Sequence, residues 1–290
     1  MKTLSTLLLA LLAAASLQAA PKKLLVVTTT TGFRHSSIAN GEKVLTQLGA
    51  DSGAFTVDFI HQPTGKPGGL KKDANADEKA AQQAAEAKWE EDLKQALQKL
   101  SPESLKNYDG VVFFNTTGDL PIPDKDGLLA WIKAGHAFIG MHAASDTFHH
   151  WPEFIDMLGG EFKTHGAQVG IECLNVEPKH PANQAVGKSW VILQEEVYQI
   201  KNYDTTKVHD LLVLDKHPND KTPGHHPVSW CKEYGQGKVF YTTLGHREDV
   251  IDADPGLKDR KNPVETSLAY QKHILGGIQW ALGLKSEKAE

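Results

Sequence analysis

The sequence predicts an α/β fold: a mostly parallel sheet with helices on both faces and antiparallel strands added near the C-terminal half. In the first half, short β-branched apolar runs alternate with helical stretches, which is the pattern of a parallel sheet. From about residue 168 onward short strands follow one another, and Gly235–Gly237 is a hairpin signal between two of them. No internal repeat or linker interrupts the chain, so residues 21–285 are expected to form one domain.

Residues 1–20 have the composition of a secretory signal peptide. Lys2 supplies the positive start, Leu7–Ala15 the apolar core, and small residues lead to a cleavage site near Ala19 or Ala20. The apolar run is too short to span a bilayer, and no cysteine follows it as a lipid anchor would require. We therefore expect a periplasmic or secreted protein that is not inserted in the membrane after cleavage.

The elements of the first half follow from apolar periodicity and from helix start and stop signals. A loop rich in Gly, Pro and Lys precedes a helix dense in Ala, Glu and Lys, and together they suggest a helical insertion at about residues 64–100. The strands are expected at 23–30, 55–60, 109–115 and 137–141, and the helices at 36–48, 79–100, 123–135 and 151–158.

The second half is expected to hold strands at 168–176, 196–200, 210–215, 228–234 and 238–244, closed by a helix at 264–282. Cys173 and Cys231 are the only two cysteines, and each lies in one of these strands. An exported protein can pair them, but two buried thiols fit the pattern equally well.

Composition narrows the classes of partner. The chain has 290 residues, of which 40% are hydrophobic and 23% charged, so a packed core is expected. The net charge is -5 and the pI about 6.3, which argues against nucleic acid because such binders carry a basic surface.

Two strand ends carry the residues that can do chemistry. Asn115–Gly118 and Gly140–Ala144 both follow apolar runs, and open α/β sheets build their sites at these carboxyl ends. The second turn sets small residues around His142, which is the composition of a nucleophile elbow with histidine in the reactive place. His246 follows another strand as Leu-Gly-His, so the two imidazoles should meet if both strands point the same way.

Histidine exchanges a proton near neutral pH, so His142 and His246 are the candidate acid and base, and Glu196 or Glu248 can fix the tautomer. Aromatic and polar side chains near the same turns can stack on a sugar and hold its hydroxyls. The candidate substrate-binding residues are Arg34, His35, Thr116, Thr117, Asp146, His165, Tyr198 and Trp230.

A metal site is the alternative for the same histidines. His142, His165 and His246 with a glutamate would suit zinc or a similar divalent ion. Neither an HExxH nor a CxxC motif supports it, so no cofactor is predicted while a divalent metal remains an option.

The ordered set of motifs resembles the ThuA-like (trehalose utilisation) family, whose fold is similar to class I glutamine amidotransferases. The resemblance covers nearly the whole mature chain and implies a flavodoxin-like sheet and a role in carbohydrate use, with keto-sugars from partner dehydrogenases as one option. The matching segments are Leu105–Asp109, Gly140–Thr147, Trp151–Pro152, Leu158–Phe162 with His165, His180–Pro181, Glu195–Tyr198, Pro227–Trp230, Tyr234–Tyr241 and Leu244–His246.

The chain departs from the amidotransferase pattern at one decisive position. The elbow of those enzymes carries cysteine, whereas this chain has His142 there and keeps only the His-x-Glu spacing of His246 and Glu248. Imidazole cannot replace a thiolate in amide hydrolysis, so glutamine amidotransferase activity is not expected. Three functions remain open: an enzyme acting on a sugar or keto-sugar as isomerase, lyase or hydrolase, a non-catalytic sugar-binding protein, and a metal-dependent hydrolase.

Overall fold

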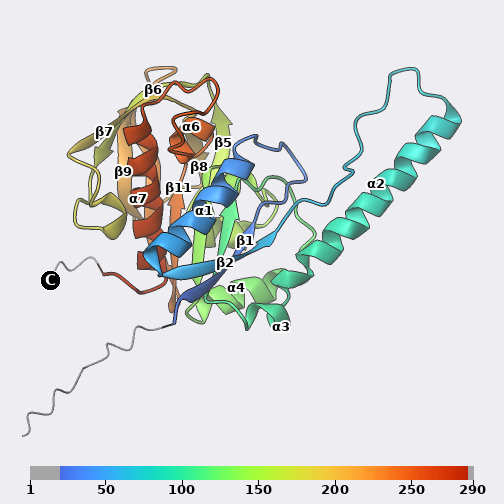
Figure 1. Ribbon diagram of the computed structural model, residues 1–290, viewed down its shortest axis with the longest axis horizontal. Helices are drawn as coiled ribbons and strands as arrows, with labels where there is room; N and C mark the ends of the chain where they lie inside the picture. The colour runs from blue at the N-terminus through green and yellow to red at the C-terminus, as the bar shows by residue number, and fades with distance from the viewer. Residues whose placement is uncertain (1–19, 287–290) are drawn as a thin grey trace, which may run out of the picture.

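A nine-stranded sheet runs through the centre of the computed structural model, which describes residues 20–286 (Figure 1). The predicted signal peptide, except for Ala20, lies outside the described residues. The strand order is β2-β1-β3-β4-β11-β10-β9-β6-β7. The first five of these strands pair in parallel: β1 (Lys22–Val27), β2 (Phe55–Ile60), β3 (Gly110–Phe114), β4 (Ala137–Met141) and β11 (Gly237–Thr242).

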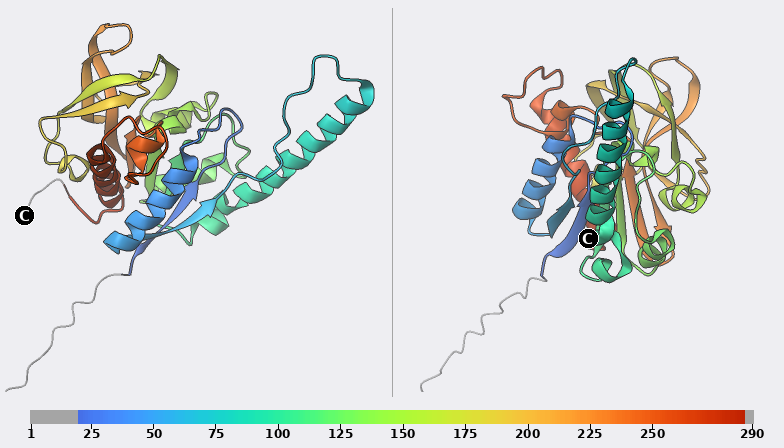
Figure 2. Two further views of the ribbon diagram at one scale, coloured as in Figure 1. Left: turned by 45° about the horizontal axis from the view of Figure 1, so that its top comes forward. Right: turned by 90° about the vertical axis from the view of Figure 1, so that its right-hand side faces the viewer.

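The parallel strands are buried on both faces. Leu24 and Val26 of β1 face one core and Leu25 and Val27 the other, and all four are fully buried. Because both faces of these strands are buried, their sequences are continuous apolar runs. Helices α1 (Ile38–Ser52), α6 (Glu248–Ile251) and α7 (Val264–Ala281) cover the first face; α3 (Pro102–Leu105), α4 (Lys125–Lys133) and α5 (Pro152–Leu158) cover the second (Figures 1 and 2).

The C-terminal half adds antiparallel strands, as predicted. β10 (Pro223–Tyr234) pairs with β11 and with β9 (His209–Lys216), and β6 (Val169–Asn175) joins β9 to the edge strand β7 (Ser189–Glu195). A separate small sheet pairs β5 (Glu161–His165) with β8 (Tyr198–Lys201). The sequence reading did not include β5 or β7, and it started β8 two residues early at Glu196.

Helix α2 (Ala76–Leu97) projects from the body of the molecule (Figures 1 and 2). A capping box between Asn75 and Glu78 starts it, because each side chain accepts from the other's backbone N–H. Its first half is exposed, which fits an insertion. Its second half buries Trp89, Leu93 and Leu97 and continues into a short 3₁₀ helix, Gln98–Leu100, so this part of the predicted insertion belongs to the core.

Cys173 and Cys231 are buried thiols on β6 and β10 and do not form a disulfide. Burial raises the pKa of the Cys173 thiol above its usual range, which makes the reactive thiolate scarce. Among residues 20–286, none of the helices has the length and apolar character needed to cross a membrane.

Candidate functional site

The carboxyl ends of the parallel strands converge on one rim, and the site is built there. His35 lies in the loop after β1, His142 follows β4 directly, and His246 lies four residues beyond β11. Glu196 reaches the same place from the turn between β7 and β8. Segments that are far apart along the chain are therefore neighbours because the parallel sheet aligns its strand ends.

The turn after β4 has the strained geometry that the sequence predicts for an elbow. His142 has φ 47°, a left-handed conformation that few non-glycine residues adopt, and a 3₁₀ helix, His142–Asp146, follows it. Gly140 lets the Tyr241 ring pack closely against β4 just before the turn, since a Cβ there would lie 2.7 Å from that ring. The Tyr241 hydroxyl donates to the His142 carbonyl at 2.5 Å and holds the strained residue in place.

Three imidazoles and one carboxylate form a compact cluster that we call the histidine floor: His35, His142, His246 and Glu196. One potential ligand atom from each lies within 4.8 Å of all the others. His246 Nδ1 is 3.3 Å from both His142 Nε2 and Glu196 Oε1, and the last two atoms are 3.8 Å apart. His35, His142 and Glu196 are buried, and His246 is half-buried.

Hydrogen bonds fix the tautomers of two of these rings. His142 Nδ1 lies 2.6 Å from the Thr243 carbonyl, which can only accept, so Nε2 keeps its lone pair. Arg247 Nη1 donates to Gln168 Oε1 at 2.9 Å, which turns the Gln168 amide nitrogen toward His246 Nε2, also at 2.9 Å. His246 Nε2 is therefore an acceptor, and the proton of the neutral ring sits on Nδ1, facing Glu196 and His142.

The structure decides between the two carboxylates that were candidates to orient His246. Glu248 accepts from the Ser36 hydroxyl, whereas Glu196 contacts the imidazole. Glu195, next to Glu196, is fully buried and accepts from the backbone N–H groups of Glu196 and Gly245.

The pKa values of the histidine floor are shifted by burial and by the contact with its one carboxylate, Glu196. Burial, with the nearby charge of His246, lowers the pKa of His35 to about 4. Burial also lowers the pKa of His142 well below its usual value. Burial alone would lower the pKa of His246, but the hydrogen bond and charge of Glu196 outweigh it and raise that pKa. Burial raises the pKa of Glu195 to about 7.

A pocket of about 240 Å³ opens above the histidine floor. His165 lies at its rim with Nδ1 3.0 Å from Glu196 Oε2, and Asp146 contributes a second carboxylate. Burial raises the pKa of Asp146. His142 is fully buried beneath the pocket and does not line it. The lining residues are Phe33, His35, Asp146, Phe162, His165, Glu196, Tyr198 and His246.

A further histidine beside the pocket is held differently, in what we call the His149 bridge: Asp146, His149 and Glu161. His149 Nε2 lies 2.7 Å from Asp146 Oδ1, and Nδ1 lies 2.6 Å from the buried carboxylate of Glu161. Burial alone would lower the pKa of His149, but the hydrogen bonds to Glu161 and Asp146 outweigh it and raise that pKa.

Four residues predicted to bind substrate do not line this pocket. The predictions for the three buried ones are corrected, and that for the exposed Arg34 stays a prediction. Trp230 is fully buried in the core, where its indole N–H donates to the Leu158 carbonyl. Thr116 and Thr117 are buried too, and their hydroxyls bond to the Thr147 hydroxyl and the Phe33 carbonyl. Arg34 donates to the Thr28 carbonyl and does not line the pocket.

The predicted ligand trio also changes in composition. His165 lies outside the close group, and His35, which was expected to bind substrate, takes its place. Phe162 and Gln168 were not singled out from the sequence. Phe162 sits on β5, a strand whose mostly polar residues carry little signal, and Gln168 matters only through its contacts with His246 and Arg247.

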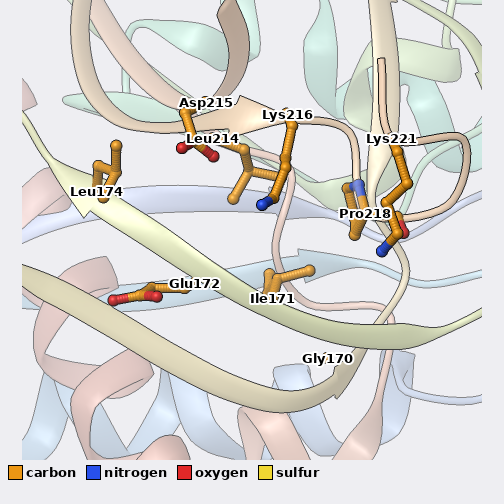
Figure 3. A pocket seen from close by; sticks show the side chains of 9 residues that line it. All are labelled: Gly170, Ile171, Glu172, Leu174, Leu214, Asp215, Lys216, Pro218 and Lys221. Carbon is orange, nitrogen blue, oxygen red and sulfur yellow. The ribbon is translucent and has the colours of Figure 1, made fainter. Parts of the chain in front are cut away.

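Another pocket, of about 250 Å³, is lined by residues of β6, of β9 and of the loop after β9 (Figure 3). Charged side chains such as Glu172, Asp215 and Lys216 line it, together with Leu174 and Leu214. None of the predicted site residues lines it.

Comparison with known proteins agrees with this architecture. The family model described as trehalose utilisation (ThuA) matches residues 23–281. A ThuA-like protein from Parabacteroides merdae ATCC 43184 is 18% identical, with 93% of each chain covered and a TM-score of 0.64. A ThuA-like protein from Bacteroides uniformis ATCC 8492 is 17% identical, with 92% of this chain and 94% of that chain covered and a TM-score of 0.58.

A cytoplasmic protein from Salmonella typhimurium LT2 is 13% identical, with 89% of this chain and 99% of that chain covered and a TM-score of 0.52. At these identities the solved structures show the fold alone. No curated protein matches the sequence.

Proposed function

Because this chain belongs to the trehalose utilisation (ThuA) family, with a carbohydrate-related function, we propose that it is an enzyme acting on a sugar or keto-sugar by histidine-based acid/base chemistry. The observation that carries the proposal is the contact of His246 with Glu196 at the bottom of an open pocket. A proton carried by His246 Nδ1 can pass to the carboxylate or to His142 Nε2, so the three groups form a proton relay that faces the pocket at one end.

The roles follow from exposure. His246 and Glu196 line the pocket and can touch a substrate, so they are the direct acid and base. His142 is fully buried and acts through His246 by accepting its Nδ1 proton. This modifies the role expected for His142, which was that of a direct acid or base.

Aromatic rings beside hydrogen-bonding groups support a sugar as the substrate. Phe33 is 67% exposed at the pocket, an unusual position for a large apolar ring, and Phe162 and Tyr198 add two further aromatic surfaces. Apolar sugar faces stack on such rings, while Asp146 and His165 are placed to bond hydroxyl groups. A pocket of about 240 Å³ suits one sugar ring rather than a polymer.

The relay fits proton abstraction beside a ketone. The base takes the proton from the carbon next to the carbonyl, the C–H electron pair forms a C=C bond, and the carbonyl oxygen receives a proton from the acid. Isomerisation follows where the α-carbon carries a hydroxyl: that hydroxyl gives its proton to the base and becomes the new carbonyl, while the former carbonyl carbon takes up a proton. Elimination follows where the next carbon carries a leaving group: the enol hydroxyl returns its proton, the C=O bond re-forms, and the leaving group departs with its bonding electron pair.

The test is turnover of 3-keto-disaccharides by the wild-type protein and by His246→Ala, Glu196→Gln and His142→Ala. Loss of an acid/base group is expected to reduce turnover roughly 10²–10⁴-fold. His61→Ala is the matched control, because His61 is an exposed histidine that pairs with Glu42. Unchanged turnover in His142→Ala and His246→Ala would remove the mechanism, and tight sugar binding without product would favour a binding protein.

We also propose that the protein is exported, to the periplasm or the medium. The support is the leader composition of residues 1–20. Fractionation of cells that express the full chain tests it: the expected result is an extracytoplasmic protein whose N-terminus begins near Ala20 or Pro21. An intact Met1 in the cytoplasmic fraction would contradict it.

A further inference from the structure

The histidine floor has the donor set and spacing of a metal centre, and this carries an inference that deepens the proposed function of the same site. Zinc-type ions bind imidazole nitrogens and carboxylate oxygens at about 2.0–2.2 Å, so two ligands of one ion lie about 3.0–3.5 Å apart. His246 Nδ1 is 3.3 Å from both His142 Nε2 and Glu196 Oε1, and all four potential ligand atoms lie within 4.8 Å of one another.

Two of the imidazoles already present what a metal ion requires. The Thr243 carbonyl holds the proton of His142 on Nδ1, so Nε2 offers a lone pair to the centre, as in the outer hydrogen bonds that orient metal-bound histidines. His35 is 6% exposed and its Nδ1 is buried without a hydrogen-bond partner. A buried polar atom that lacks a partner is costly, and an ion on the floor would give the ring one.

We propose that the histidine floor binds one divalent transition-metal ion, such as zinc, through His35, His142, His246 and Glu196. The ion sits at the bottom of the pocket, where it can reach a sugar carbonyl or hydroxyl oxygen. The bound ion would occupy the lone pairs of the three imidazoles and of Glu196, so these groups could no longer accept a proton. In the loaded protein His165 and Asp146 remain as pocket groups that can transfer protons.

Gln168 sets the affinity in this arrangement. Ligation through His246 Nδ1 requires the ring proton to move to Nε2, but Gln168 directs its amide nitrogen to that atom because Arg247 holds its oxygen. Metal binding therefore has to turn the Gln168 amide over and break its bond to Arg247. A carboxylate at position 168 would accept from Nε2 and pair with Arg247 at the same time, the carboxylate–histidine–metal arrangement.

The experiment measures ion binding rather than turnover. Protein stripped with a chelator is titrated with Zn²⁺ by calorimetry and with Co²⁺ by visible absorption. One equivalent of each is expected, with a Co²⁺ spectrum of nitrogen and oxygen ligands. His35→Ala and Glu196→Gln should weaken Zn²⁺ binding at least tenfold, and Gln168→Glu should strengthen it about tenfold or more.

His61→Ala is the matched control, since His61 is an exposed histidine outside the close group and its loss should leave Zn²⁺ affinity within about twofold. His35→Gln, with circular dichroism of every variant, guards against loss of folding. Binding of less than one equivalent, or wild-type affinity in folded His35→Ala and Glu196→Gln, would overturn the site.

Turnover of the stripped protein separates this inference from the proposed function. Activity without the ion supports acid/base chemistry at His246 whatever the ion does. Activity that appears only after loading would leave the metal site standing and overturn the direct acid/base roles of His246 and Glu196.

Discussion

Two clusters of histidine and carboxylate flank the same pocket, and their proportions differ. The histidine floor has three imidazoles for one carboxylate, and burial lowers the pKa values of His35 and His142. The His149 bridge has two carboxylates for one imidazole, and its hydrogen bonds raise the pKa of His149 against the effect of burial. The number of carboxylate partners therefore decides whether the pKa of an imidazole at this pocket falls with burial or rises above its usual value.

The largest expected effect comes from breaking the His149 bridge at Glu161. This buried carboxylate contacts His149, Lys201 and Asn202, so Glu161→Leu leaves His149 and Lys201 without their shared partner. Loss of one side of a buried ion pair costs about 3–5 kcal/mol, and the exposure of Lys201 places the expected loss near the lower end. Urea unfolding measures it.

Glu103→Gln is the control for that measurement. Glu103 pairs with Lys106 on the surface, where its side chain is 84% exposed, and exposed pairs contribute little. A loss in Glu161→Leu no larger than in Glu103→Gln would show that the bridge does not stabilise the fold, and the contrast with the histidine floor would fail.

An effect of similar size is expected from Glu196, the carboxylate of the histidine floor, and it should fall on activity. Glu196→Gln keeps the shape and a hydrogen-bond acceptor for His246 but removes the charge. We expect kcat/KM on the keto-sugar to fall roughly 10²–10³-fold, or about 3–4 kcal/mol of transition-state stabilisation, because an acid/base partner is lost. Unfolding free energy should change much less than in Glu161→Leu.

Steady-state kinetics and urea unfolding of the same Glu196→Gln preparation decide this. If stability falls as far as in Glu161→Leu while kcat/KM stays within a few-fold of wild type, the floor is structural and the roles of the two clusters are reversed.

The sequence predicts the central parallel strands better than the short strand β5 and the edge strand β7. The parallel strands are buried on both faces, and strands buried in this way appear in the sequence as continuous apolar runs such as Leu24–Val27. β5 is Glu-Phe-Lys-Thr-His and mostly exposed, so only its pairing with β8 makes it a strand. The edge strand β7 exposes Val191 and Leu193, which blurs the usual alternation of apolar and polar residues.

The same limit applies to the site. His142 and His246 could be predicted because each follows a strand in an unusual turn, and parallel strands bring such turns together. Trp230 was misplaced because a strand pattern does not say which face a residue occupies, and β10 turns this indole into the core. The roles of His35 and Gln168 depend on loop paths and on single hydrogen bonds, neither of which has a sequence period.

The charge of His149 gives a pH-dependent prediction of moderate size. The folded pKa is raised above the ordinary value of 6.5, so protonated His149 stabilises the fold. That stability is fully present below about pH 6.5 and is lost as the pH rises through the folded pKa. Urea unfolding of wild type and His149→Gln should differ by about 1–2 kcal/mol at acidic pH, with a smaller difference in alkaline solution.

His61→Ala serves as the control across the same pH series, since the His61 side chain is 59% exposed. A His149→Gln effect that grows toward alkaline pH would mean that the bridge holds a neutral imidazole, and the two clusters would then not differ in charge.

The smallest expected effect is on KM, and it tests whether the His149 bridge also positions Asp146 for substrate binding. His149 Nε2 holds Asp146 Oδ1 at 2.7 Å, while His149 Nδ1 contacts Glu161. Asp146 in turn lines the pocket. If Asp146 bonds a sugar hydroxyl, His149→Gln should raise KM about two- to fivefold with kcat nearly unchanged, because uniform binding is lost while the proton relay is intact.

A fall in kcat of the same size would instead show that the His149 bridge takes part in the chemical step. The clusters would then act as one unit, and the double variant with Glu196→Gln would show it as a loss smaller than the product of the two single losses.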